Sequence, residues 1–141
     1  MRRSVPDTNA VISSFLFEYT TPAQALHKLN TETEMLTSDE TFAEIREVLA
    51  RPKFDRYVSA AAKTRLLTRF RNSVTMIPIT EHIEACRHPK DDKFLSLAVS
   101  GNADLILTGD NDLLVLHPFR DIDIIFPADY LVRPTPPVDT P

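Results

Sequence analysis

The sequence predicts an α/β fold in which a central parallel sheet is covered by helices on both faces. Short β-prone runs alternate with longer segments whose apolar residues recur at helical spacing. This alternation is typical of βαβ units, and their right-handed crossovers place helices on both sides of the sheet. The strongest strand signal is residues 104–108, a largely apolar run that is bounded by Gly109. We therefore expect a three-layer α/β/α sandwich with four to five parallel strands.

The N-terminal half is predicted to contain two strands and four helices. The first strand is expected although Pro6 cannot donate a hydrogen bond to a central ladder. Thr21, which precedes a proline, is a typical N-cap. Ser38 is another, because the two acidic residues after it favour the first turn of a helix. The predicted strands are residues 3–7 and 34–37, and the predicted helices are residues 10–17, 23–30, 38–50 and 59–72.

The C-terminal half is predicted to contain three strands, with helices between them. Gly101 is expected to end the helix that Asp91 and Asp92 open. The predicted strands are residues 74–79, 104–108 and 122–126, and the other helical segments are residues 81–87 and the single turn 127–131. Residues 133–141 hold four prolines and are expected to be a disordered tail. The folded domain is therefore expected to comprise residues 1–132.

Composition indicates one globular domain without a membrane anchor. The chain has 141 residues, 43% of them hydrophobic, which is enough for a substantial core. It contains no run of about 18 apolar residues that could span a bilayer. The N-terminus is charged and lacks the apolar stretch of a signal peptide. Cys86 is the single cysteine, so an internal disulfide is excluded and a reducing cytoplasm is the expected location.

Four acidic residues follow predicted strands or lie on the helices after them: Asp7, Glu44, Asp92 and Asp110. Ligands of open parallel sheets bind outside the carboxyl ends of the strands, so these side chains are expected to share one crevice. Carboxylates repel one another, and a crevice that gathers them needs a cation. Oxygen ligands suit one or two ions of Mg²⁺ or Mn²⁺. Asp112 could serve as a further ligand.

Small polar neighbours of these acids could orient the ligands or hold a bridging water, namely Thr8, Asn9 and Thr108. Each aspartate taken singly also has a simpler explanation as a turn residue or N-cap. Asp91 and Asp92 are adjacent, and only one of them need be a ligand. Asp92 is the predicted ligand because Leu95 and Ala98 then lie at helical spacing behind it, whereas Asp91 becomes the cap of the helix.

Basic residues are concentrated in one segment of an acidic chain. Residues 51–71 contain seven basic residues and one acid, a net charge of +6, which leaves −10 for the rest of a chain whose total is −4. A basic arm beside an acidic crevice suits a phosphodiester substrate. A solvated helix face is the alternative explanation. The candidate RNA-binding residues are Lys53, Arg65, Arg69 and Arg71, and the aromatic rings that could stack on bases are Phe54 and Tyr57.

Several other function classes are disfavoured by the absence of their motifs. The chain has only two glycines and no G-x-G-x-x-G or Walker A sequence, which argues against dinucleotide oxidoreductases and P-loop NTPases. It has no G-x-S-x-G for an α/β-hydrolase. Its histidines lack the H-E-x-x-H spacing of a zinc site.

The chain resembles the PIN-domain family, in the branch that is described as toxin components of toxin–antitoxin systems. Four blocks carry this resemblance in order, over about residues 3–132: Asp7-Thr8-Asn9; Glu44 followed by Val48-Leu49-Ala50-Arg51-Pro52-Lys53-Phe54; Asp92 followed by Leu95 and Ala98; and Leu107-Thr108-Gly109-Asp110 followed by Asp112-Leu113-Leu114.

The resemblance implies a Mg²⁺- or Mn²⁺-dependent ribonuclease, similar to VapC toxins, that is paired with a small antitoxin protein and forms a homodimer. The acidic set implied as catalytic metal ligands is Asp7, Glu44, Asp92 and Asp110, with Asp112 as a fifth. A non-catalytic RNA-binding or protein-interaction module on the same fold is the alternative function, and another metal phosphoesterase such as a DNA nuclease is a third.

Overall fold

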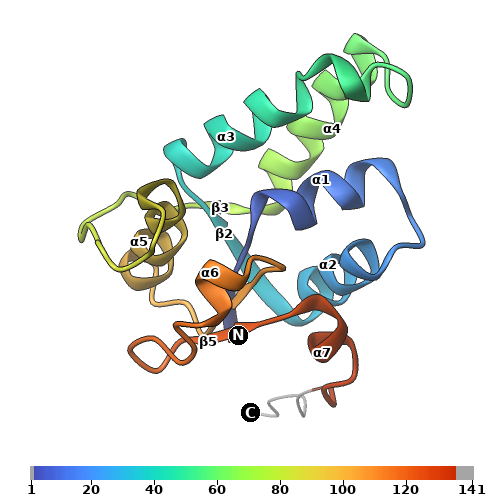
Figure 1. Cartoon of the computed structure of the whole chain (residues 1–141). Coiled ribbons are helices and arrows are strands. Elements are labelled where there is room, and N and C mark those ends of the chain that lie inside the picture. The colour runs from blue at the N-terminus through green and yellow to red at the C-terminus, as the bar shows by residue number, and fades with distance from the viewer. Residues whose placement is uncertain (1, 136–141) are drawn as a thin grey trace.

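One parallel sheet forms the centre of the protein (Figure 1). The structure is a computed structural model and describes residues 2–135. The strand order is β3-β2-β1-β4-β5, so β1 is central and pairs in parallel with β2 and β4. The strands are β1 (Arg2–Pro6), β2 (Thr33–Thr37), β3 (Thr75–Met76), β4 (Leu105–Leu107) and β5 (Asp123–Ile125). The predicted three-layer α/β/α fold with a parallel sheet is confirmed.

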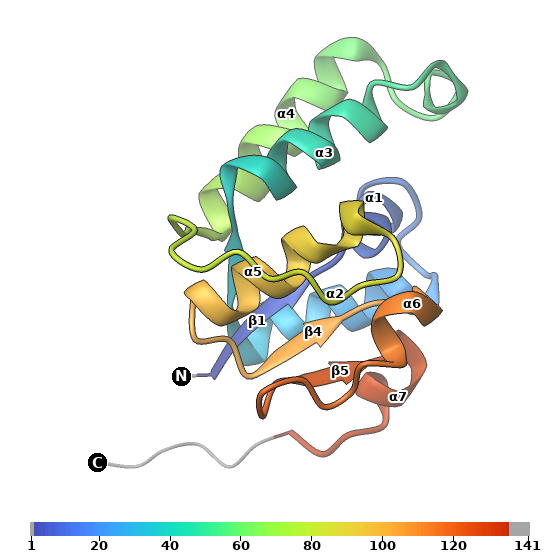
Figure 2. The same cartoon turned by 60° about the vertical axis from the view of Figure 1, so that its left-hand side comes forward.

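Helices cover both faces of this sheet (Figure 2). One apolar core contains side chains from α1 (Thr8–Leu16), α2 (Thr21–Glu32), α3 (Asp39–Leu49), α4 (Ala60–Ser73) and α7 (Pro127–Leu131). The second core contains side chains from α5 (Asp92–Ser100) and α6 (Asn111–Leu114). Two short 3-10 turns, η1 (Pro52–Phe54) and η2 (Pro89–Asp91), precede α4 and α5.

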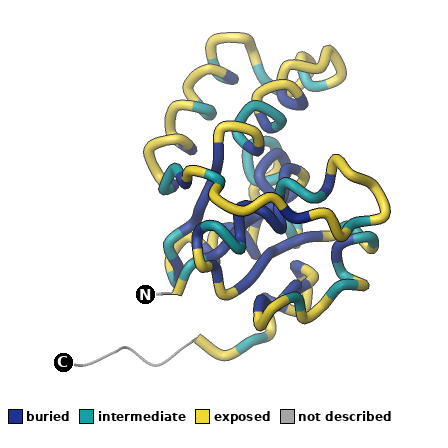
Figure 3. Tube along the Cα trace, turned by 90° about the vertical axis from the view of Figure 1, so that its left-hand side faces the viewer, coloured by how far each residue is buried: buried dark blue, intermediate teal, exposed yellow. Residues whose placement is uncertain are grey.

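Strand β4 is apolar and buried along its whole length because helices cover both of its faces. In β4, Leu105 and Leu107 belong to the first core, whereas Ile106 between them belongs to the second. In β2, Met35 and Leu36 divide in the same way. This is the two-residue period of a strand. Figure 3 shows the buried sheet between two layers whose outer sides are exposed.

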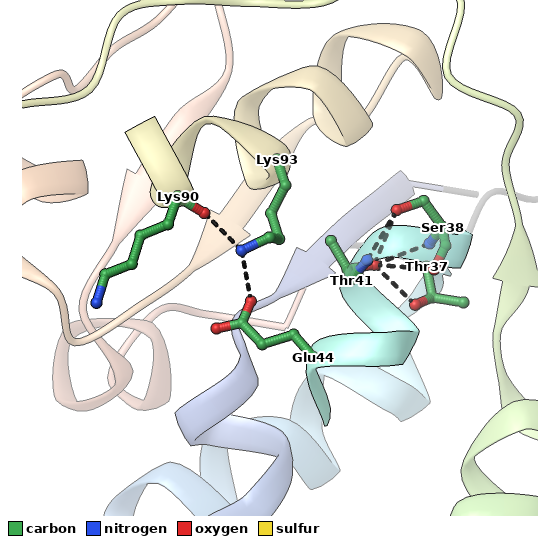
Figure 4. A network of polar contacts seen from close by, with 6 residues as sticks. All are labelled: Thr37, Ser38, Thr41, Glu44, Lys90 and Lys93. Carbon is green, nitrogen blue, oxygen red and sulfur yellow. Dashed lines mark hydrogen bonds and ion pairs between the residues drawn. The ribbon is translucent and has the colours of Figure 1, made fainter. Parts of the chain in front are cut away.

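Side-chain caps begin most of the long helices. Ser38 caps α3 and forms a reciprocal pair with Thr41, in which each side chain accepts the other residue's backbone N–H (Figure 4). Thr20 caps α2, so the prediction of Thr21 was one residue late, and the following proline occupies the first turn as expected. Asp7 caps α1, with its Oδ1 atom 2.8 Å from the amide nitrogen of Ala10. The pair of Ser38 and Thr41 therefore starts α3 directly after the end of β2.

The predicted helix over residues 81–87 is wrong, because this segment is irregular. Residues 80–86, here named the α5 strap, run along α5 and donate their backbone N–H groups to its side chains. Ser100 accepts from residues 80 and 81, Ser96 accepts from Ile83, and Asp92 accepts from residues 85 and 86. These amides are thus satisfied by another element and do not form the hydrogen bonds of a helix.

Three smaller differences concern the ends of elements. The third strand is only Thr75–Met76, shorter than the predicted residues 74–79. Residues 111–114 form the short helix α6, for which no element was predicted. The tail was predicted to begin at residue 133, but Arg133 is held by the fold: its carbonyl oxygen accepts from Lys28, and its guanidinium contacts Asp123. Residues 136–141 of the predicted tail lie outside the described residues.

Among residues 2–135, no helix is both long enough and apolar enough to cross a bilayer.

Gly101 ends α5 as predicted. A Cβ atom at this position would lie 2.5 Å from Cδ1 of Leu36, inside van der Waals contact. A glycine is therefore needed here because the end of α5 lies directly against β2.

Candidate metal centre

Asp7 is a buried carboxylate at the carboxyl end of the central strand. It directly follows β1, and Asp7 is only 5% exposed to solvent. Oδ1 accepts the amide of Ala10, and Oδ2 accepts the hydroxyl of Thr108 at 2.6 Å and the amide of Gly109 at 3.3 Å. Burial raises the pKa of Asp7, and the donated hydrogen bonds oppose that rise. The carboxylate is thus fixed in place at the edge of the sheet.

Asp110 lies beside Asp7, at the end of the adjacent strand β4. Its amide donates to Oγ1 of Thr108 at 3.0 Å, so the fully buried Thr108 hydroxyl links the backbone of Asp110 to the Asp7 carboxylate. Its Oδ1 atom caps α6 by accepting the amide of Asp112. The negative charge of Asp110 also contributes to the raised pKa of Asp7, since the two carboxylates are neighbours. The register of β1 and β4 therefore brings these two predicted residues together.

Three carboxylates converge at this edge. Asp91, Asp110 and Asp112 each offer an oxygen atom, and these oxygens lie within 4.8 Å of one another. Burial, followed by the nearby charge of Asp110, raises the pKa of Asp91. Three carboxylates at this separation repel one another unless a cation lies between them. The donor set consists of oxygen atoms alone, which suits Mg²⁺ or Mn²⁺ better than a softer metal.

Asp92, the predicted ligand from this pair, is engaged elsewhere. Its Oδ1 atom accepts the amides of Ala85 and Cys86 at 3.0 and 2.7 Å in the α5 strap. Burial would raise the pKa of Asp92, but these hydrogen bonds outweigh burial and lower it. Asp91, the predicted cap, makes no side-chain capping hydrogen bond and belongs to the acidic cluster instead. Asp91 thus occupies the predicted N-cap position, and its carboxylate, rather than that of Asp92, lies in the acidic cluster.

Glu44 does not belong to the cluster of three oxygens. Its Oε2 atom lies 2.8 Å from Nζ of Lys93, which also donates to the carbonyl oxygen of Lys90 at 2.6 Å (Figure 4). Glu44 lies on α3 and Lys93 on α5, so this ion pair joins two helices at the rim of the site. The structure therefore places Asp7 beside Asp110, groups Asp112 with Asp110, and gives Glu44 a cationic partner.

The polar neighbours of Asp7 differ in their surroundings. Thr8 is buried, and its Oγ1 atom has no hydrogen-bond partner within residues 2–135. Asn9 is exposed and lines a hollow of about 130 Å³ together with Asp7 and Gly109. A buried hydroxyl without a partner beside carboxylates is consistent with a site that receives a further polar group.

Two residues near the cluster were not among the predicted ligands. His88 lies at the start of the turn that carries Asp91, and its Nε2 atom is 3.3 Å from Oδ2 of Asp112. Cys86 lies nearby in the α5 strap, where burial and then Asp92 raise its pKa to about 12. The thiol is therefore protonated at neutral pH, as expected for an inert cysteine.

The predicted basic arm forms no single patch. Lys63 is paired with Asp55 at 2.7 Å. Arg69 lines a hollow that α1 and α2 share with α4, whereas Arg71 lines another hollow between α3 and α4. Lys53 lies over the ring of Phe54, 5.1 Å from its centre. Phe54 packs against the first core, while Tyr57 is exposed and contacts the ring of Phe17 edge to face. The basic residues thus face in several directions around α4.

A sequence signal for Asp91 exists in the pattern of α5. Asp92, Ser96 and Ser100 recur every four residues, and all three accept amides from the α5 strap. Asp91 lies three residues before the buried Phe94 and so shares its side of the helix. The polar stripe that begins at Asp92 would have distinguished the two aspartates.

A parallel α/β protein with carboxylates gathered at the carboxyl ends of its strands is the class that this geometry defines. A family model of the PIN domain matches residues 3–112, and the chain belongs to the PIN domain family. Uncharacterized protein MJ1680 of Methanocaldococcus jannaschii is 30% identical over 115 residues, which cover 80% of this chain and 74% of that protein.

Two solved structures share the fold. VapBC2 from Rickettsia felis, crystallised with a DNA fragment from its promoter, gives a TM-score of 0.60 at 11% identity, over 88% of this chain and 98% of the other. PAE2754 from Pyrobaculum aerophilum gives a TM-score of 0.60 at 19% identity, over 93% of this chain and 88% of the other. At these identities the likeness concerns the architecture.

Proposed function

We propose that the protein is a Mg²⁺- or Mn²⁺-dependent endoribonuclease that serves as the toxin of a toxin–antitoxin pair. The observation that carries this proposal is the convergence of three carboxylate oxygens within 4.8 Å, beside a buried fourth carboxylate, in a chain of the PIN domain family. Such a cluster is costly without a cation, and its oxygen atoms are the ligands that these hard metals prefer.

The proposed ligands are Asp7, Asp91, Asp110 and Asp112. A divalent ion held there would lower the pKa of a bound water and stabilise the charge that develops on a phosphate. Thr108 and Gly109 fix the orientation of Asp7 by donating to its Oδ2 atom. The cap of α6 in turn orients Asp110. Asp92 has a different proposed role, because it holds the α5 strap through two backbone amides.

RNA as the substrate is supported by the family and by the charge of the segment 51–71. Its net charge of +6 lies in a chain whose total is −4, so phosphodiesters would be attracted to α4 and the turn before it. The proposed phosphate contacts are Lys53 and Arg65 together with either Arg69 or Arg71, which line separate hollows. A small antitoxin protein is the proposed partner, because the chain shares its fold with a structure of VapBC2, and assembly as a homodimer is proposed with it.

Cleavage of RNA by the purified full chain tests the proposal. We expect cleavage with Mg²⁺ or Mn²⁺, none with chelator, and none in Asp91→Asn or Asp110→Asn protein. Asp92→Asn is the matched control, because an asparagine Oδ1 atom can accept the same two amides. Cleavage that persists in Asp91→Asn protein, or that does not need metal, contradicts the proposed site.

A non-catalytic nucleic-acid-binding module is the second candidate. It is favoured by the contacts of Glu44 with Lys93 and of Asp92 with the α5 strap, which occupy two of the four predicted acids. This function predicts salt-sensitive RNA binding without cleavage. RNA that stays intact with every divalent metal, while binding is retained, would favour it over the nuclease.

A further inference from the structure

Lys93 connects two acidic segments at the rim of the site. Its Nζ atom is 2.8 Å from Oε2 of Glu44 on α3, and it donates to the carbonyl oxygen of Lys90 in the turn that ends at Asp91 (Figure 4). The Lys93 side chain is 11% exposed and that of Glu44 is 30% exposed. The ammonium group is therefore held at a shielded position, and its residue is two positions after Asp91 in the sequence.

The contact with Lys93 balances the charge of Glu44. The Oε2 atom of Glu44 is buried, and within residues 2–135 it makes no other ion pair and no hydrogen bond of good geometry. In contrast, no lysine or arginine of residues 2–135 lies within ion-pair distance of Asp91, Asp110 or Asp112. The acids thus divide into two groups. The three clustered aspartates have no lysine or arginine at ion-pair distance, whereas Glu44 is paired with Lys93.

We propose that Lys93 is a positioning residue that acts as the resident cation of Glu44, so that the site takes a single divalent ion without Glu44 as a ligand. This inference rests on the proposed function, because it concerns the same site. Lys93 also ties the turn that carries Asp91 to α3, and so fixes the distance between Asp91 and the ends of the strands.

Electrostatics gives the reason for a single ion. A second divalent ion at Glu44 would lie beside an ammonium group, and like charges in a shielded site repel each other strongly. Withdrawing Glu44 from Lys93 would also leave a largely buried ammonium without its partner. Both effects make a second ion, and coordination of any ion by Glu44, energetically unfavourable. They do not apply to the three carboxylates that lack a cationic side chain.

Titration of the chelator-stripped full chain with MnCl₂, followed by calorimetry and by the Mn²⁺ electron paramagnetic resonance signal, tests the inference. We expect one equivalent of Mn²⁺ in the wild type and in Glu44→Gln protein, with dissociation constants within about twofold of each other. Asp91→Asn should weaken binding by about tenfold or more, because a carboxylate of the cluster is lost. Lys93→Met should tighten binding by about tenfold or add a second equivalent, because it frees Glu44. Lys93→Arg keeps the charge and should behave as the wild type.

The outcomes separate the two proposals. Weakening by Glu44→Gln as large as that by Asp91→Asn overturns the role of Lys93, and so does a second Mn²⁺ equivalent in the wild type. Undiminished binding in Asp91→Asn protein instead overturns the proposed metal site. If Lys93→Met protein does not fold, as judged by its thermal unfolding, the comparison of Glu44→Gln with Asp91→Asn still decides the question.

Discussion

Asp91 and Asp92 are adjacent in sequence but have opposite surroundings. Asp91 is buried beside Asp110, which raises its pKa, whereas Asp92 accepts two backbone amides, which lower its pKa although burial opposes them. Helical geometry causes the difference, since successive residues point about 100° apart. One aspartate therefore faces the ends of the strands, and the other faces the α5 strap.

This difference predicts distinct effects of the two substitutions by alanine. Asp91→Ala should leave the free energy of unfolding of the metal-free protein unchanged or raise it, because it removes one of three repelling carboxylates. Asp92→Ala should lower it by about 1–3 kcal/mol, because the amides of Ala85 and Cys86 lose a charged acceptor. Urea unfolding in the presence of chelator measures both values. Equal losses in the two variants would contradict the assigned surroundings.

Thr108 contributes through its hydroxyl group. This group donates to Asp7 and accepts from the amide of Asp110, and the residue is completely buried. Thr108→Val keeps the shape but should lower the free energy of unfolding by about 1–3 kcal/mol, because two buried polar partners lose a hydrogen bond. Thr108→Ser retains the hydroxyl and is the control. A valine variant as stable as the wild type in urea would show that Asp7 and Asp110 find other partners.

At the scale of elements, the α5 strap is held by side chains and not by backbone pairing. Ser96 accepts the buried amide of Ile83. We expect Ser96→Ala to increase hydrogen exchange over residues 80–86 while exchange of β1 and β4 stays slow, because the strap opens separately from the sheet. Ser100→Ala, whose hydrogen bonds are exposed, should have the smaller effect. Uniform acceleration over the whole chain would argue against an independently opening strap.

Glu34 links three neighbouring strands, and its hydrogen bonds indicate that the stability of the fold depends on pH. Its carboxylate accepts Thr75 at 2.7 Å and Arg3 at 3.1 Å. The hydrogen bond from Thr75, followed by that from Arg3, lowers the pKa of Glu34 below its ordinary value of 4.5. A lowered folded-state pKa adds stability above the unfolded value, and this stability disappears as the pH falls through the folded value.

The melting temperature of Glu34→Gln protein should therefore lie below that of the wild type at pH 7. The difference should shrink as the pH is lowered from 4.5. Calorimetric scans across this range measure it. A difference that grows in acid would mean that Glu34 does not stabilise the sheet through its charge.

The sequence was sufficient to predict elements whose signal is local. The apolar run of β4, the cap at Ser38 and the stop at Gly101 are set by neighbouring residues, and all three were predicted. The α5 strap was missed because its amides bond to side chains up to 20 residues away. The surroundings of Asp91 and Asp92 depend on the same strap, and in the sequence only the polar stripe of Asp92, Ser96 and Ser100 indicates them.

The predicted site shows the same division between local and distant causes. Asp7 directly follows β1, and Asp110 lies three residues after the end of the adjacent strand β4, so the order of the sheet brings them together. The position of Glu44 depends on Lys93, which lies on another helix and whose charge no local pattern reveals. Ligand assignments for Asp7, Glu44, Asp91, Asp110 and Asp112 remain predictions for the metal titrations.

At the scale of the whole molecule, the charge is unevenly distributed, and the arginines of α4 lie on different sides. Arg69 and Arg71 line separate hollows, so a single RNA strand cannot use both in the same way. We expect one of Arg69→Gln and Arg71→Gln to reduce the slope of log affinity against log salt by about 0.7, and the other to leave it unchanged. Filter binding of single-stranded RNA with chelator measures the slopes. Equal reductions would indicate one continuous basic surface.

Phe70 is the one buried apolar side chain of α4, and its ring meets Phe15 edge to face and lies parallel to Phe42. Phe70, with the partly buried Leu67 one turn before it, thus attaches α4 to the first core. A small molecule that displaces the ring of Phe70 would loosen α4 and its arginines. The strands and the carboxylates at their ends would keep their positions. Binding of a nucleic acid could then be inhibited separately from its cleavage, without a change to any acidic residue.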